Sequence, residues 1–219
     1  MRPITVSVGP LSTASANNIA LSQTPSAAGA LTLNGSLVPT TGPEAGTAQL
    51  DNPRRILITT ADTTTKFTIV GETPTGASLT ESFLVSAGST YSALDYAEVT
   101  AITVNQGTTA AVTVGTNGIA STPWARMDEW ANTQVSMQFD VVGTANYTVQ
   151  STLDDPNSPT NPVLPSAVNW VNTNDANLVN ATSTLQGNYL FSPTFIRVLL
   201  NSGSGSVTAT LAQANVANL

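Results

Sequence analysis

Apolar and polar residues alternate over short stretches of this chain, with the two-residue period of a strand that has one buried face. The clearest stretch is 134–141, where one face carries Val135, Met137, Phe139 and Val141. Turn residues interrupt the pattern too often for long helices. We therefore predict an all-β fold of antiparallel strands, arranged as a β-sandwich or jelly-roll.

Other predicted strands are short runs of β-branched and aromatic residues between turns that contain Gly, Pro or Asn. Their ranges are 4–8, 55–60, 66–71, 79–86, 98–104, 110–115, 146–152, 167–171, 194–201 and 206–212. Turns at 72–76, 105–107, 142–145 and 202–205 are predicted to fold neighbouring strands into hairpins. One helical turn is expected within 124–130, where Asp128 and Glu129 break the alternation.

This pattern divides the chain into three parts. Residues 1–52 hold the first strand and then an irregular region rich in Pro, Gly, Ala, Ser and Thr; residues 53–120 and 121–219 form two β subdomains. A structureless loop as long as 9–50 is unusual inside a compact domain. Two interpretations stay open: a loop wrapped over its own domain, or an extended arm that orders on a neighbouring subunit.

Composition supports the all-β prediction and limits the chemistry. Apolar residues make up 41% of the chain but charged residues only 9%, against about a quarter in typical globular proteins. Long solvated helices need charged residues on their outer face, which this chain lacks. It also has no His and no Cys, which excludes Ser-His-Asp and Cys-His catalysis, disulfides and ordinary zinc sites.

The charge balance argues against nucleic acid as a partner. The formal net charge is −7 and the chain has six basic residues, of which only Arg54 and Arg55 are adjacent. Phosphate recognition needs several clustered cations. No stretch is long and apolar enough for a membrane span, and the N-terminus does not read as a signal peptide. We expect a protein that is made in the cytoplasm without an export signal, and that has no contact with a membrane or with nucleic acid.

Three segments resemble a known group of proteins. They are RRILITTADTTTKFTIVGETPTGASLTESF (54–83) with VTAITV (99–104) and VTVGT (112–116), then NYTVQSTLDD (146–155), then FIRVLLNSGSGSVTATLAQA (195–214). In this order they look like small virion structural proteins of tailed bacteriophages, similar to capsid decoration (cement) proteins. The resemblance covers most of 53–214 and does not include residues 1–52.

The resemblance implies a non-enzymatic structural role, with no catalytic, cofactor-binding or metal-binding residues to carry over. It implies a location on the capsid surface, where the chain binds the major capsid protein and other copies of itself, with a trimer as one arrangement. A tail component (tube, adaptor or fibre subunit) and a receptor- or carbohydrate-binding module are the alternatives.

Carboxylate pairs are the remaining route to an enzyme, since a glycosidase uses two carboxyl groups across a cleft. The candidate pairs are Glu72 with Glu81, Asp95 with Glu98, and Asp128 with Glu129. The simpler interpretation is that these side chains keep a surface of low charge soluble. We expect no enzymatic activity.

Three further features have both a functional and a structural interpretation. Oxygen ligands for calcium crowd Asp154, Asp155, Asn157 and Ser158, but Asx-rich turns look alike without metal. Trp124, Trp130 and Trp170 could stack on a sugar, or belong to a core or an interface. Arg197 either covers apolar surface with its stem or pairs with an acidic residue of a neighbour.

Overall fold

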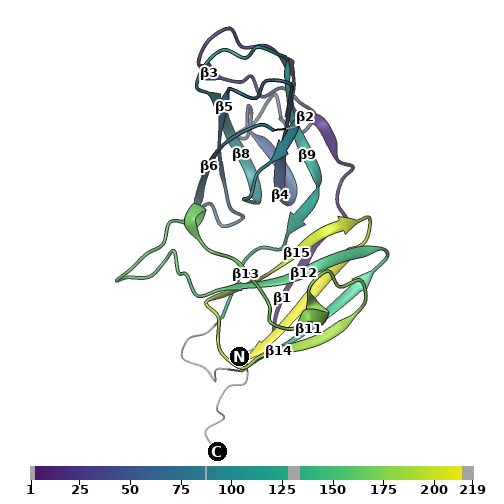
Figure 1. The fold of residues 1–219 in the computed structure, drawn as a ribbon. Coiled ribbons are helices and arrows are strands. Elements are labelled where there is room, and N and C mark those ends of the chain that lie inside the picture. The colour runs from purple at the N-terminus through teal and green to yellow at the C-terminus, as the bar shows by residue number, and fades with distance from the viewer. Residues whose placement is uncertain (1–2, 87, 128–133, 214–219) are drawn as a thin grey trace, which may run out of the picture. The chain divides into compact units, whose positions relative to one another are not determined.

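The computed structural model describes residues 3–86, 88–127 and 134–213, and in these ranges it confirms the predicted all-β fold. The chain forms two compact units (Figure 1). The central unit is Ser12–Gly118, and the terminal unit combines Met1–Leu11 with Ile119–Leu219. The observed division after Gly118 lies close to the expected one near 120, but the first strand belongs to the terminal unit.

The central unit is built on antiparallel strands in the order β9-β4-β8-β5-β6. Three further strands pair with members of this sheet: β2 with β9, β3 with β8 and β7 with β4. The bounds are β2 Ser15–Gln23, β3 Gly29–Ala30, β4 Ala48–Thr60, β5 Lys66–Glu72, β6 Ser78–Leu84, β7 Ser89–Tyr91, β8 Tyr96–Val104 and β9 Val112–Ser121.

Alternating residues of these strands form the core of the central unit. In β5, for example, Phe67 and Ile69 are fully buried while Lys66 is exposed. The same core contains Ile56 and Ile58 of β4. The period of two seen in the sequence is therefore the period of burial.

Residues 12–52, for which a wrapped loop and an extended arm were both open, fold onto the central unit itself. Strand β2 pairs with β9, and Ile19 of β2 is fully buried in the central core. Leu31 and Val38, from the irregular stretch after β2, are buried in the same core. Of the two interpretations of 9–50, the structure supports a region that wraps over its own domain, for residues 12–50.

The terminal unit is a sandwich of two antiparallel sheets, with strand orders β1-β16-β11-β14 and β13-β12-β15-β9 (Figure 1). The last residues of β9 and the short β10 both pair with β15. Two short 3₁₀ helices, η1 and η2, complete the unit. The bounds are β1 Ile4–Val8, β10 Ala125–Arg126, β11 Val135–Val142, β12 Ala145–Thr152, η1 Pro165–Ala167, β13 Val171–Asn172, η2 Ala176–Leu178, β14 Leu185–Tyr189, β15 Phe195–Gly203 and β16 Ser206–Gln213.

The core of the terminal unit lies between these sheets. Phe139 of β11 and Tyr147 of β12 meet there, with ring centroids 5.7 Å apart. Burial raises the pKa of the Tyr147 phenol to about 12, and its hydroxyl donates to the Ser183 carbonyl. The predicted strand 134–141 is confirmed as β11, and its apolar face is the one that enters this core.

Of the predicted hairpins, the one around 72–76 is confirmed, because β5 and β6 pair from Lys66–Leu84 to Glu72–Ser78. The other three are wrong. Strand β4 separates β8 from β9, so the turn at 105–107 does not join neighbours. The turns at 142–145 and 202–205 each carry the chain from one sheet of the sandwich to the other.

Two local predictions also need correction. Ala125 and Arg126 form a strand rather than a helical turn, and the rest of that predicted turn, 128–130, lies outside the described residues. The predicted strand 167–171 is replaced by η1 and the two-residue β13.

Candidate protein-binding site

A pocket with a volume of about 310 Å³ opens on the terminal unit. It lies between the end of β12, the short strand β13 and the segment that follows β14. The residues that line it are mostly neutral: Ser151, Thr152, Leu153, Asp154, Asn169, Val171, Asn172, Thr173, Asn174, Tyr189 and Phe191. Its volume is at the lower end of the range of about 300–1,000 Å³ that is usual for binding pockets.

The walls of the pocket are fixed by hydrogen bonds. Ser151 pairs with Val171 across β12 and β13, and the Asn169 amide donates to the Asp154 carboxylate at 2.7 Å. The Asn172 carboxamide oxygen accepts from Gln150 at 2.9 Å. These contacts hold β13 at the edge of the sheet although it is only two residues long.

Apolar side chains at the mouth of the pocket are unusually exposed. Leu153 keeps 70% of its surface exposed, Val171 54% and Phe191 42%. Leu190, next in the chain to Phe191, is also mostly exposed. We call Leu153, Val171, Leu190 and Phe191 the apolar rim. An exposed apolar cluster beside a concavity is typical of a surface that binds another molecule.

Tyr189 forms part of the pocket wall. Its ring packs edge-on against Phe191, with 5.2 Å between ring centroids. The side chain is almost completely buried, and its hydroxyl has no hydrogen-bond partner among the residues that the structure describes. A buried hydroxyl without a partner is costly, so a ligand that offers it an acceptor or donor would gain affinity.

A proline-rich loop, 153–165, starts at this pocket. At its base both terminal nitrogens of Arg126 donate to the Asp155 carboxylate at 2.8 Å. This bond to Arg126 lowers the pKa of the Asp155 carboxyl below its ordinary value. The carboxylate predicted as a calcium ligand is thus neutralised by a guanidinium, which argues against calcium at Asp154, Asp155, Asn157 and Ser158.

The tryptophans, for which a sugar platform and a core or interface were both open, do not form a flat platform. Trp124 and Trp170 do meet, but edge to face, with centroids 5.2 Å apart. The guanidinium of Arg197 lies 4.3 Å from the Trp170 ring centroid and its Nε donates to Gln150. One face of Trp170 is therefore already covered, and Trp130 lies outside the described residues. Arg197 itself is buried and stacks within its own chain.

The predicted partners Glu72 and Glu81 are not opposite each other across β5 and β6. Glu81 lies opposite Ile69 and accepts from the amides of Ala93 and Leu94. Glu72 is opposite Glu98 instead, a pairing that the sequence did not reveal. Among the described residues no cluster of three or more acidic side chains could hold a metal ion.

Asp95, the partner predicted for Glu98, is buried and forms an ion pair with Arg55 at 3.4 Å. The remaining predicted pair, Asp128 and Glu129, lies outside the described residues.

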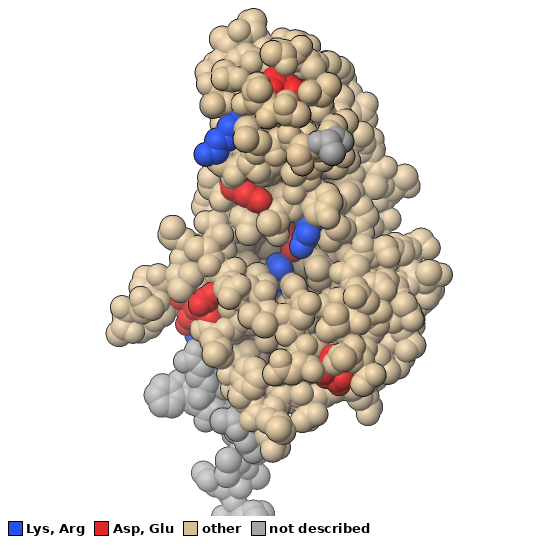
Figure 2. Space-filling view, viewed as in Figure 1, with Lys and Arg blue, Asp and Glu red and all other residues tan. Residues whose placement is uncertain are grey.

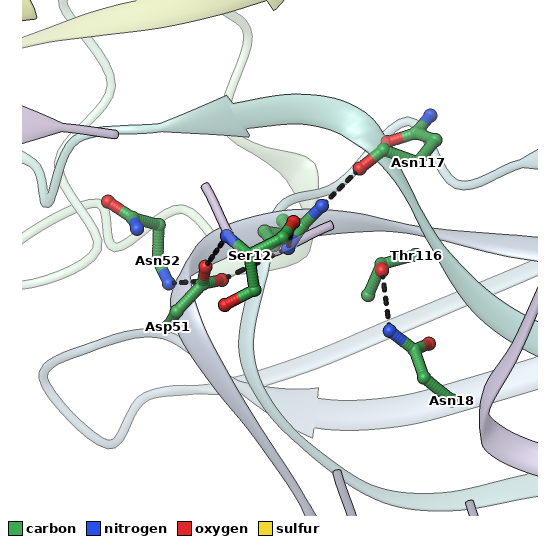
Figure 3. Close-up of polar contacts among 7 residues, drawn as sticks. Ser12, Asn18, Asp51, Asn52, Thr116 and Asn117 are labelled. Atoms are coloured by element: carbon green, nitrogen blue, oxygen red, sulfur yellow. Dashed lines mark hydrogen bonds and ion pairs between the residues drawn. The ribbon is translucent and has the colours of Figure 1, made fainter. Parts of the chain in front are cut away.

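Arg54 has a structural role in the central unit. Its guanidinium donates to the Ser12 carbonyl at 3.0 Å, to the Asp51 carboxylate at 3.2 Å and to the Asn117 carbonyl at 2.5 Å (Figure 3). Ser12 and Asn117 lie close to the first and last residues of the central unit in the sequence. The Arg54 side chain therefore links the beginning of this part of the chain to its end. Burial raises the pKa of Asp51, but hydrogen bonds from Ser12 and Arg54 outweigh it and leave that pKa lowered.

The surface outside these contacts carries little charge. On the face shown in Figure 2, acidic and basic side chains are few and separated by wide neutral areas. Neutral Thr, Ser and Asn side chains can hydrogen-bond to a partner without the desolvation cost of a charge. The apolar rim was missed by sequence reasoning because its residues lie in or beside loops, where alternation carries no signal.

Comparisons with known proteins found no relative. No protein-family model matches the chain, and neither a curated protein nor a solved structure matches it. In the described part of the chain, no helix has the length and apolar character needed to cross a bilayer.

Proposed function

We propose that this chain is a structural subunit of a tailed-bacteriophage particle, acting as a capsid decoration protein. In this role it binds the outside of the head across neighbouring major capsid protein subunits. The observation that carries the proposal is the apolar rim around a pocket on a neutral surface, because such a surface suits a protein partner.

The resemblance in sequence supports the same role. Its segments fall on β4, β5, β6, β8 and β9 of the central unit and on β12, β15 and β16 of the terminal unit. They therefore cover strands that build both cores. The resemblance concerns the framework of the protein, and the apolar rim contributes the surface through which it would act.

The proposed mechanism is mechanical and needs no catalytic step. DNA packed in the head pushes the capsid subunits apart, and a protein bound across two of them must be released before they separate. Binding to the assembled lattice and not to free subunits stabilises the lattice by mass action. Many modest contacts suffice when several copies act together. The acidic net charge of −7 keeps the protein from phage DNA before assembly.

A binding experiment with undecorated expanded heads tests this function. Purified chain is mixed with the heads, pelleted and quantified, and the heat resistance of the heads is measured. We expect saturable binding and greater resistance. Leu153→Asp should weaken binding about tenfold or more, while Val142→Asp, equally exposed at the end of β11, should not. If the Leu153 variant binds the heads as tightly as the unmodified chain, the apolar rim is not the surface that contacts the capsid.

Electron cryomicroscopy of the virion separates decoration from its alternatives. Copies distributed over the head support decoration, whereas copies confined to the tail would make the chain a tube, adaptor or fibre subunit. The contact between Trp124 and Trp170 is the observation that favours a carbohydrate-binding module. Binding to host-surface glycans, without binding to heads, would support that module instead.

A further inference from the structure

The proline-rich loop presents one large apolar side chain to solvent. Leu164 is 72% exposed and stands between Val163 and Pro165. Its backbone, at φ −56° and ψ 137°, has the extended conformation of polyproline II. In Figure 1 the loop leaves β12 and returns to β13 within the terminal unit.

The loop holds this side chain on a fixed backbone. The Asp155 carbonyl accepts from the amides of Ser158 and Val163, each at 3.2 Å. The Asp155 carboxylate is held by Arg126, and the Leu164 carbonyl accepts from Ala167 at 2.8 Å. A segment ordered in this way loses little conformational entropy when it binds.

The terminal unit thus carries both a knob and a hole. The knob is Leu164, and the hole is the 310 Å³ pocket bordered by Leu153, Val171 and Phe191. Leu164 does not line the pocket of its own chain, and its exposure shows that it is not packed elsewhere. An apolar knob and an apolar pocket at different places on one surface fit each other in two copies of the chain.

We propose that Leu164 of one copy docks into this pocket of a second copy. Charge permits a second copy, because segment 156–164 contains no ionisable side chain and therefore approaches an otherwise acidic protein without repulsion. Within the pocket lining the ionisable groups are Asp154, already bonded to Asn169, and the buried Tyr189. The inference extends the proposed function by naming copies of the chain as one of its partners.

Each copy offers one knob and one hole, so the contact is either reciprocal, giving a closed dimer, or head-to-tail, giving a ring or an open chain. A ring of three copies would suit lattice positions that have threefold symmetry. The mass of the assembly distinguishes these geometries, and the contact between Leu164 and the pocket is the same in all of them.

Sedimentation of the full-length chain over a wide concentration range tests the contact. We expect reversible self-association. Leu164→Asp removes the knob and Leu153→Asp blocks the hole, and each should weaken association about tenfold or more. Val142→Asp is the matched control, because this equally exposed side chain is neither knob nor hole and should leave association unchanged. Thermal unfolding checks that each variant is folded.

Mixing the two variants gives the decisive measurement. The Leu164 variant keeps an intact pocket and the Leu153 variant keeps an intact loop, so the mixture should form a 1:1 complex where neither variant associates alone. A mixture that stays monomeric while the unmodified chain associates would overturn the contact, as would a chain that is monomeric at every concentration. Binding to phage heads by such a monomer would leave the proposed function standing, so the two failures are distinguishable.

Discussion

Both terminal nitrogens of Arg126 lie 2.8 Å from the carboxylate oxygens of Asp155. Arg126 belongs to β10, which pairs with β15, while Asp155 begins the proline-rich loop. The bidentate geometry is the favourable one for guanidinium and carboxylate. One side-chain pair therefore joins the sandwich to the loop that carries Leu164.

Asp155→Ala is expected to loosen this loop and leave the sandwich folded. The free energy of unfolding should fall by about 1 kcal/mol, since the pair is partly exposed. Limited proteolysis within 156–164 should become faster, because the base of the loop loses its anchor. Asp140→Ala is the control: that carboxylate accepts from the nearby Gln138 and fixes no loop. Equal proteolysis of both variants would contradict the anchoring role.

Arg54→Met is expected to destabilise the central unit strongly. The substitution leaves the Ser12 and Asn117 carbonyls and the Asp51 carboxylate without the donor that joins them. Arg54 is 1% exposed, and breaking a buried charged contact costs about 3–5 kcal/mol. Chemical denaturation followed by circular dichroism measures the change. Lys66→Met, at an exposed position of β5, should change stability by less than about 0.5 kcal/mol.

Sequence patterning predicted where most strands lie but, apart from the hairpin of β5 and β6, not how they pair. In β11, alternation gave both the strand and its buried face, because burial itself has that period. The turn at Gly143 looked like a hairpin, yet it connects two sheets, since a Gly turn can reverse the chain in either way. Its partner is distant in sequence: the Gly205 amide donates to the Thr144 carbonyl at 2.7 Å.

The irregular region and the site escaped prediction for a related reason. Ile19, Leu31 and Val38 are buried but have no common period, because each reaches the core from a different short segment. The pocket combines β12, β13 and Phe191, which are separated in the chain and meet only in the fold. Such a site depends on tertiary pairing, which a single sequence does not encode locally.

Asp62 is expected to make stability depend on pH. Asp62 as a residue is 2% exposed, and its carboxylate accepts hydrogen bonds from the amides of Thr109, Thr64 and Thr65 and from two threonine hydroxyls. These bonds, above all those from the Thr109 and Thr64 amides, hold the pKa of Asp62 far below its usual range. The pKa of this carboxyl is therefore lower in the folded chain than in the unfolded chain, where it is about 3.9. The ionised carboxylate stabilises the fold above about pH 3.9, and this stabilisation is lost as the pH falls towards the folded pKa.

Asp62→Asn tests this linkage. The side-chain amide has the shape of the carboxylate but no charge, and its NH₂ group would face threonine N–H and O–H groups that are themselves donors. The difference in unfolding free energy between the unmodified chain and the variant should be constant from about pH 7 to about pH 5 and shrink below about pH 4. Denaturation across this range measures it, with Asp140→Asn as the control. A difference that stays the same in acid would show that the charge of Asp62 is not its source.

Gly71→Ala is expected to destabilise the central unit because β5 and β8 approach too closely there for a side chain. A Cβ on Gly71 would lie 2.1 Å from the Glu98 carbonyl oxygen and 2.7 Å from the Tyr96 ring. The register of the pair shifts between Val70 and Gly71, so backbone atoms would have to move. Overpacking of this kind costs about 1–3 kcal/mol, to be measured by chemical denaturation. Gly118→Ala places its Cβ in open space and should be nearly neutral; equal losses at both positions would contradict the steric explanation.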